Sequence, residues 1–409
     1  MALLVLYHCK REFPPRWSLR DNIYAFPGAY YVNVAFRRLP AYLLQPGAVQ
    51  AVLFHHSLLI ERMFPEYFRR LLRRLEPLSE LPARRALMVQ DEHLLIDVIL
   101  ELIHTWRVNE VFSVASPSLW PRLYPDLPPE VRLHFLLTGY LEMARLPRVR
   151  AWIGHQPRNI DVGYRARPPS LEQGSHGQLK ARIAYETQHF TRALGLRSDI
   201  SVQPEDTLLG AAWYQFLARC RYVVGVEGGA SILDADGSLR QAVLAGQGLP
   251  PDHKDDLAYF ALSPRHLEAC LTRTGQILVE GDYGGVLRPW EHYLPVKRDL
   301  SDLPQVLQRV SDEPLRQQMT ERAYREVVAS ETYSNERLCE RVYESLQLSP
   351  TTPTPLLKWD RAMDHLSWAA LALYDWGVEP ARRGLRAGLG GLLGEQRAQA
   401  LVARLRGQR

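Results

Sequence analysis

The segment from Ser263 to Glu268 combines a helix start with groups that could bind a phosphorylated ligand. Serine followed by proline is typical of the N-cap and first position of a helix. The free backbone N–H groups of that first turn, with Arg265 and His266 beside them, favour an anion such as a diphosphate. Glu268 lies one turn further along and could accept hydrogen bonds from two ribose hydroxyls. The alternative is an ordinary capped helix with a solvated glutamate.

A second group of cations flanks the loop 168–177, which follows a predicted strand. Arg165, Arg167 and Lys180 could clamp a diphosphate from that side. Only five of the 50 basic residues are lysine. In a chain so rich in arginine, surface arginines without a ligand are the competing interpretation.

Polar residues that end other predicted strands are candidates for acid or base chemistry. In the run 90–93, Asp91 and His93 could take the proton of an acceptor hydroxyl if this strand end faces a cleft. His55 and His56 follow a different strand and carry the same ambiguity. Strand ends are commonly polar in any case, so both runs could simply be solvated.

Apolar runs that alternate with helix-like stretches predict the elements that position these residues. The predicted strands are Leu3–Tyr7, Ala48–Phe54, Arg85–Val89, Val111–Val114 and Val131–Leu137, then Ile160–Tyr164, Ile200–Val202, Tyr222–Val226 and Gln276–Val279. Strands separated by helices indicate parallel sheets, and ligands bind beyond the carboxyl ends of such strands. The predicted fold class is therefore α/β, with two Rossmann-like domains that face each other across a cleft.

The sequence around and after Glu268 resembles the donor half of GT-B glycosyltransferases. The matching features are the run Leu267-Glu268-Ala269, the strand 276–279, the turn Tyr283-Gly284-Gly285, the stretch 292–299 and two closing helices. The resemblance covers about residues 160–346 and is to bacterial family-4-like (retaining, group 1) polysaccharide glycosyltransferases. It implies a GT-B fold, a nucleotide-sugar bound by these motifs and by basic side chains near its diphosphate, and no obligatory metal.

One position departs from that family's pattern. The family has a first glutamate eight residues before the Leu-Glu-Ala glutamate, and this chain has Phe260 there. Glu227, at the end of a predicted strand, is the candidate substitute, and Gly228 and Gly229 would let the backbone approach the donor closely. A plain turn from strand to helix is the alternative. Because the spacing differs, the stereochemical outcome stays open.

The chain divides into three predicted parts. Residues 1–155 form the acceptor domain, 156–348 the donor domain, and 349–409 a linker and a basic helical tail. Residues 376–409 hold seven arginines and two glutamates, a net charge of +5 that equals the formal excess of the whole chain. Arginine beside leucine and tryptophan is typical of segments that lie on an anionic membrane. A helical appendage, packed on the body or used for dimerisation, is the alternative.

Composition excludes several classes of protein. A chain with 46% hydrophobic and 23% charged residues is not disordered. Its apolar runs fall short of the roughly 20 residues that span a bilayer, and its neutral body argues against nucleic acid. The N-terminus lacks the features of a signal peptide, and four scattered cysteines fit a reducing cytoplasm. Asp234 and Asp236 form an Asp-x-Asp pair that could hold a divalent ion, but the glycine and serine that follow favour a turn, so no metal is predicted.

The leading prediction is a cytoplasmic glycosyltransferase, hexosyltransferase-like and metal-independent, with peripheral attachment to the inner membrane as a hypothesis for the tail. It would move a sugar from a UDP- or GDP-sugar to a glycan or lipid-linked acceptor in bacterial surface polysaccharide biosynthesis, without a cofactor. One alternative is a nucleotide-sugar 2-epimerase of the same build. Another is a non-catalytic sugar-nucleotide-binding subunit of a polysaccharide assembly complex. A dinucleotide-dependent oxidoreductase is disfavoured because no Gly-x-Gly-x-x-Gly follows the first strand of either domain.

Overall fold

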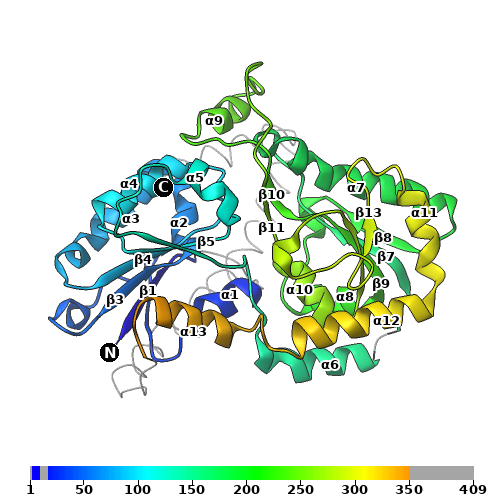
Figure 1. Ribbon diagram of the computed structural model, residues 1–409, viewed down its shortest axis with the longest axis horizontal. Helices are drawn as coiled ribbons and strands as arrows, with labels where there is room; N and C mark the ends of the chain where they lie inside the picture. The colour runs from blue at the N-terminus through cyan, green and yellow to red at the C-terminus, as the bar shows by residue number, and fades with distance from the viewer. Residues whose placement is uncertain (1, 10–16, 156, 350–409) are drawn as a thin grey trace, which may run out of the picture.

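The computed structural model describes residues 2–9, 17–155 and 157–349. Within these ranges two parallel β-sheets lie side by side, each flanked by helices (Figure 1). One sheet comes from the amino-terminal third of the chain and the other from residues 160–296. The predicted α/β fold with two Rossmann-like domains is confirmed.

The first sheet has six parallel strands in the order β2-β1-β3-β4-β5-β6. They are β1 (Leu3–Tyr7), β2 (Tyr30–Asn33), β3 (Ala51–Phe54), β4 (Arg84–Met88), β5 (Glu110–Ser113) and β6 (Arg132–Phe135). The helices of this region are α1 (Trp17–Ile23), α2 (His56–Leu59), α3 (Pro65–Leu75), α4 (Ile96–Thr105), α5 (Trp120–Leu123) and α6 (Leu146–His155). Every residue of β1, β3 and β5 is buried, as expected for central parallel strands covered on both faces.

The second sheet has five parallel strands in the order β13-β12-β9-β7-β8. They are β7 (Ile160–Arg165), β8 (Ser198–Ser201), β9 (Cys220–Gly225), β12 (Gly275–Val279) and β13 (Leu294–Val296), and an antiparallel pair is formed by β10 (Gly228–Ala230) and β11 (Tyr259–Ala261). The helices here are α7 (Gly174–Ala193), α8 (Ala211–Arg219), α9 (Ser238–Leu244), α10 (Pro264–Leu271), α11 (Leu303–Gln308), α12 (Glu313–Ala323) and α13 (Asn335–Ser345).

All nine predicted strands are present, with ends displaced by a few residues, but four further strands were not predicted. β2 and β13 are short edge strands, and β13 contains a proline. β10 is Gly-Gly-Ala, a composition with low strand propensity. Strands this short show no period in the sequence, and those of this length that were predicted, such as β3 and β5, were found from their apolar runs alone.

Two helices pack on the domain opposite to the one predicted for them. α6 packs against α8, and Arg150 Nη2 donates to the Tyr324 hydroxyl at 2.7 Å. α13 returns to the first domain, where the Tyr343 hydroxyl donates to the Pro27 carbonyl at 2.8 Å. The chain crosses between the domains before α6 and again before α13. Each predicted boundary, at 155 and at 348, therefore assigns one helix to the domain on which it does not pack.

A segment between β10 and β11 connects the two domains a second time. The Asp234 N–H donates to the His93 carbonyl at 2.8 Å, and the Leu95 N–H donates to the Asp234 carbonyl at 2.8 Å. Leu257 and Tyr259 are buried in the core of the first domain. In Figure 1, α9 of this segment lies at the top between the domains, whereas α6 and α13 lie at the bottom. The domains are therefore joined on two sides.

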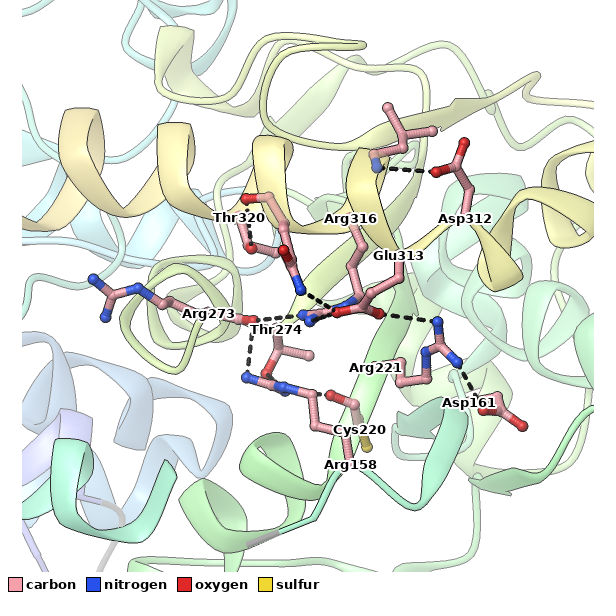
Figure 2. Close-up of polar contacts among 12 residues, drawn as sticks. Arg158, Asp161, Cys220, Arg221, Arg273, Thr274, Asp312, Glu313, Arg316 and Thr320 are labelled. Carbon is pink, nitrogen blue, oxygen red and sulfur yellow. Dashed lines mark hydrogen bonds and ion pairs between the residues drawn. The ribbon is translucent and has the colours of Figure 1, made fainter. Parts of the chain in front are cut away.

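An ionic network closes the amino ends of β7, β9 and β12 (Figure 2). Arg158 Nη2 donates to the Thr272 and Arg273 carbonyls at 2.7 and 2.9 Å. Arg316 Nε donates to Glu313 at 2.9 Å, and Arg221 Nη2 donates to the same carboxylate at 3.0 Å. These cations hold the starts of strands and of α12 together, at the end of the sheet where no ligand is expected.

None of the helices in the described part of the chain combines the length and the apolar character that a membrane span requires. The predicted tail lies outside the described residues, so its membrane hypothesis stays a prediction.

Candidate functional site

A cavity of about 530 Å³ lies at the carboxyl ends of the second sheet. Ser18 of α1 also lines it, so the first domain contributes to its wall. Residues predicted from the sequence line it as well: Arg165, Arg167, Lys180, Glu227, Gly228, Ser263, Arg265 and Glu268. The structure thus brings together side chains that are separated by up to a hundred residues. Asp91, His93, Gly229, His266, Tyr283, Gly284 and Gly285 do not line the cavity directly.

The cationic wall is formed by Lys180 of α7 and Arg265 of α10. Lys180 Nζ donates to the Gly229 carbonyl at 2.9 Å. Burial lowers the pKa of Lys180 to about 8, with Arg265 lowering it further and Asp91 opposing both. Arg265 Nη1 donates to the Arg165 carbonyl at 2.7 Å. Two cations beside the amino end of a helix form the kind of surface that binds a diphosphate.

Arg165 lines the cavity, but its guanidinium has partners within the protein. Nη2 donates to Asp199 at 2.7 Å, and Nη1 donates to two backbone carbonyls. The guanidinium also lies 4.6 Å from the centre of the Phe216 ring. Its charge is therefore already partly balanced, and Lys180 and Arg265 are the stronger candidates for phosphate.

Glu268 lines the cavity one turn after Arg265 on α10, next to two aromatic residues of α8. The Trp213 indole N–H donates to Oε2 at 2.6 Å, and the Tyr214 hydroxyl donates to Oε1 at 3.3 Å. Burial raises the pKa of Glu268, and these two donors oppose that shift. Trp213 is not among the site residues predicted from the sequence, because an aromatic residue at helical spacing usually lies in the core. Only the fold shows that it lines the cavity.

Glu227 follows β9 and is held by the turn after β12. The Tyr283 N–H donates to Oε1 at 2.7 Å, and a side chain at Gly281 would collide with this carboxylate. Burial raises the pKa of Glu227, and the backbone donors oppose it. Gly284 and Gly285 have φ of +64° and +70°, so they shape this turn. Glycine is needed there because other residues rarely adopt that conformation.

His266 and Gly229 support the cavity from behind. His266 is buried, with Nδ1 3.0 Å from Gln276 Oε1 and Nε2 3.3 Å from the Val226 carbonyl. Gly229 has φ of +103°, and a side chain there would collide with the Tyr259 carbonyl across the β10–β11 pair. The physical reason for this glycine is therefore close strand pairing.

The run 90–93 is held firmly at the end of β4. Arg62, which is 1% exposed, donates to the carbonyls of Gln90, Asp91 and Leu94. Glu92 accepts from the hydroxyls of Tyr124 and Tyr259, both at 2.9 Å. Sequence reasoning did not find this network, because its members come from distant segments.

Asp91 and His93 flank that buried glutamate. His93 is 5% exposed, and burial lowers its pKa to about 4 although Asp91 opposes the shift. Asp91 is only partly buried, and it lies close enough to Lys180 for its charge to oppose the lowering of the Lys180 pKa. Of the two, Asp91 is better placed to meet a ligand.

Of the two histidines after β3, His55 is buried and His56 is partly buried, and both have lowered pKa values. His55 Nδ1 accepts from the Ser57 N–H at 3.2 Å, so Nε2 carries the proton that it shares with Asn22 Oδ1 at 2.8 Å. Burial lowers the pKa of His56 to about 4. His55 thus acts as the N-cap of α2.

Asp234 and Asp236 bind backbone groups. Asp234 accepts from the N–H groups of Leu239 and Arg240 at 3.1 and 2.8 Å, and Asp236 accepts from Ser238 at 2.9 Å. The turn interpretation of this pair is thereby supported.

No family model and no curated protein matches the chain significantly. Among solved structures, HepE of Anabaena in complex with UDP-glucose aligns with 11% identity and a TM-score of 0.47, over 85% of this chain and 99% of its own. TarM of S. aureus aligns with 11% identity and a TM-score of 0.45, over 72% of this chain and 54% of its own. A glycosyltransferase from Rickettsia africae aligns with 8% identity and a TM-score of 0.42, over 85% and 98%.

This chain therefore spans about half the length of TarM. HepE was solved with UDP-glucose, and the Rickettsia protein is described as a glycosyltransferase. All three TM-scores lie below 0.5, so these matches carry no argument, and the chemistry of this chain has to be argued from its own residues.

Proposed function

We propose that this chain is a nucleotide-sugar-dependent glycosyltransferase whose donor occupies the cavity at the carboxyl ends of the second sheet. The observation that carries the proposal is a combination of groups in one cavity: the cations Lys180 and Arg265 together with the buried carboxylate of Glu268. A nucleoside diphosphate needs both, cations for its phosphates and an acceptor for its ribose hydroxyls. Trp213 adds apolar surface beside the carboxylate.

Charge development explains how this site would promote transfer. The bond between the anomeric carbon and the diphosphate oxygen breaks, the acceptor oxygen bonds to that carbon, and negative charge grows on the leaving diphosphate. Lys180, Arg265 and the first N–H groups of α10 would stabilise that charge, which is the kind of stabilisation that lowers barriers most.

The acceptor would lie on the first domain, a glycan or a lipid-linked sugar by this hypothesis. Asp91 is the candidate base for its hydroxyl proton, because it is partly exposed and lies close enough to Lys180 for its charge to oppose the lowering of the Lys180 pKa. His93 would support that loop, since burial keeps it neutral. Glu227 is the candidate to face the anomeric carbon from the second domain.

Transfer without a divalent ion is part of the proposal. Asp234 and Asp236, the one Asp-x-Asp pair considered from the sequence, have backbone donors on their carboxylates. Activity in excess EDTA tests this point, and activity that returns only with manganese or magnesium contradicts it.

Attachment to an anionic membrane surface through residues 376–409 is a further part of the hypothesis, supported by the net charge of +5 in that segment. The full chain should float with anionic liposomes at low salt, and a chain that ends at Pro355 should not. Failure of the full chain to float contradicts the attachment.

A non-catalytic binding subunit is the second candidate, and Phe260 is the observation that favours it. This residue stands where the resembled family has a carboxylate, and its ring stacks on His176 at 4.1 Å. Such a subunit would bind nucleotide-sugar without turnover. An epimerase would instead isomerise or hydrolyse the donor with no acceptor present.

A thermal-shift panel of UDP, GDP, ADP, CMP and their sugars tests the proposal first, because a ligand that binds the native state raises its stability. One nucleotide series should raise the melting temperature, and sugar release should require an added acceptor. No shift with any nucleotide contradicts the proposal, whereas a shift without turnover under any acceptor favours the binding subunit.

A further inference from the structure

Two side chains of α7 bind three consecutive backbone carbonyls of the cavity wall. His176 Nε2 lies 3.1 Å from the Glu227 carbonyl and 3.3 Å from the Gly228 carbonyl. Lys180, one turn later, donates to the Gly229 carbonyl at 2.9 Å. Glu227 and Gly228 line the cavity, so α7 holds the backbone of this wall from behind.

The hydrogen bonds fix one tautomer of His176. A ring nitrogen that faces two carbonyls must carry a proton, so Nε2 is the donor. On the other side of the ring, Arg298 Nη2 lies 3.0 Å from Nδ1. A guanidinium can only donate, so Nδ1 accepts and carries no proton. The imidazole is therefore neutral, and each ring nitrogen has a partner.

Packing prevents the ring from rotating away from these partners. His176 is 1% exposed, and Phe260 stacks on it with ring centres 4.1 Å apart and planes 27° apart. The Arg298 guanidinium also lies 4.8 Å from the centre of the Phe260 ring. Burial, with Lys180 and Arg298 nearby, lowers the pKa of His176 to about 4.

We propose that His176, held by Arg298 and Phe260, is a positioning residue that fixes the Glu227–Gly228 wall of the donor cavity. His176 touches no ligand in this account. It acts through the carbonyls that it binds, and these set the direction in which the Glu227 side chain leaves the backbone. The nature of the ligand rests on the proposed function, but the fixed wall does not.

Two variants and a matched control test the proposal. His176→Gln keeps a donor for the carbonyls and an acceptor for Arg298, whereas His176→Leu keeps neither. His189→Leu is the control, because His189 is an exposed histidine of the same helix. We expect His176→Leu to weaken binding of the nucleotide that stabilises the protein most by tenfold or more, measured by calorimetry. His176→Gln should stay within about threefold of the original affinity, and His189→Leu should bind as the original chain does.

Two measurements need no nucleotide. Nitrogen NMR of ¹⁵N-histidine-labelled protein, assigned with His176→Gln, should show His176 as the neutral Nε2–H tautomer at pH 7. Hydrogen exchange of the peptide that covers residues 227–231 should be faster in His176→Leu than in His176→Gln and His189→Leu. A charged ring or the Nδ1–H tautomer overturns the proposal, as does exchange that His176→Leu leaves unchanged.

The outcomes separate this proposal from the function. If the original chain binds none of the nucleotides, the proposed function fails, and tautomer and exchange still decide the positioning role. If the original chain binds a nucleotide and His176→Leu binds it equally well, the positioning role fails while the function stands.

Discussion

Cations gather at both ends of the second sheet, and their surroundings differ. At the amino ends of the strands, Arg158 donates to backbone carbonyls, and Arg221 and Arg316 share the carboxylate of Glu313. At the carboxyl ends, Lys180 and Arg265 border a cavity of about 530 Å³.

This difference indicates that the partners of a cation determine whether it stabilises the fold or binds a ligand. Buried donors with several protein acceptors connect segments of the fold, and their loss exposes unpaired groups. Lys180 and Arg265 line a cavity and donate to one backbone carbonyl each, so further donors are left for a ligand. Variants at the amino end should therefore change stability, and variants at the carboxyl end should change binding.

The largest effect is expected for Arg158→Ala. This change removes the donor of the Thr272 carbonyl and the nearer of two donors of the Arg273 carbonyl, which also accepts from Arg316 at 3.4 Å, so the free energy of unfolding should fall by about 3 kcal/mol. Urea denaturation measures it, and Arg192→Ala, at an exposed arginine of α7, is the control. If Arg158→Ala and Arg192→Ala lowered the free energy of unfolding equally, the structural role assigned to Arg158 would be wrong.

Lys180→Met should instead weaken binding and leave the stability of the fold nearly unchanged. Loss of a charged donor to the diphosphate should weaken nucleoside diphosphate binding by about 2 kcal/mol, roughly 30-fold, by calorimetry. The free energy of unfolding should change little, because Lys180 is only partly buried and the variant loses a single hydrogen bond within the protein, the one to the Gly229 carbonyl. Lys297→Met, at an exposed lysine, is the matched control. Unchanged affinity in Lys180→Met would mean that this side of the cavity binds no phosphate.

Affinity should also depend on pH through Lys180. Its pKa of about 8 means that the ammonium is charged below pH 8 and loses its proton as the pH rises through that value. Because the diphosphate prefers the charged form, affinity should be constant near pH 7 and fall about tenfold by about pH 9. Lys180→Arg should flatten the profile, since arginine stays charged. A profile that is equally steep in Lys180→Arg would assign the dependence to another group.

The smallest effect is expected for Glu313 at the amino end. Hydrogen bonding to Arg316 lowers the pKa of Glu313 to about 2. A lowered carboxyl pKa contributes stability above the unfolded value, near 4.5, that is lost as the pH falls toward 2. Glu313 is partly exposed, so Glu313→Gln should reduce this acid-induced loss by less than about 1 kcal/mol. Denaturation at pH 7 and pH 3 measures it, and a larger acid sensitivity in the variant would contradict the assignment.

Much of the fold could be predicted from the sequence, because apolar runs that alternate with helices can hardly form anything but buried parallel strands. Leu3–Tyr7 is buried along its whole length, and its run of apolar residues predicted this. β10 and β11 could not be predicted, because Gly-Gly-Ala becomes a strand only when Tyr259–Ala261 pairs with it.

The candidate site, too, could be predicted only in part. Ser263-Pro264 predicted the start of α10, and Glu268 lines the cavity as its position in that helix suggested. The partners could not be predicted: Asp199 balances Arg165, and Trp213 binds Glu268, through contacts between segments far apart in sequence. Spacing places a side chain on an element, whereas only the fold places its partner.

The central claim is that the cavity binds a nucleoside diphosphate with its phosphates at Lys180 and its ribose at Glu268. Calorimetry with the diphosphate, the monophosphate and the nucleoside, on the original chain, Lys180→Met and Glu268→Gln, tests it most directly. Loss of a phosphate should weaken binding strongly in the original chain and in Glu268→Gln but only slightly in Lys180→Met, and Glu268→Gln should weaken all three ligands by about 1–3 kcal/mol. If loss of the phosphates costs the same in all three proteins, or if none of the ligands binds the original chain, the account is contradicted.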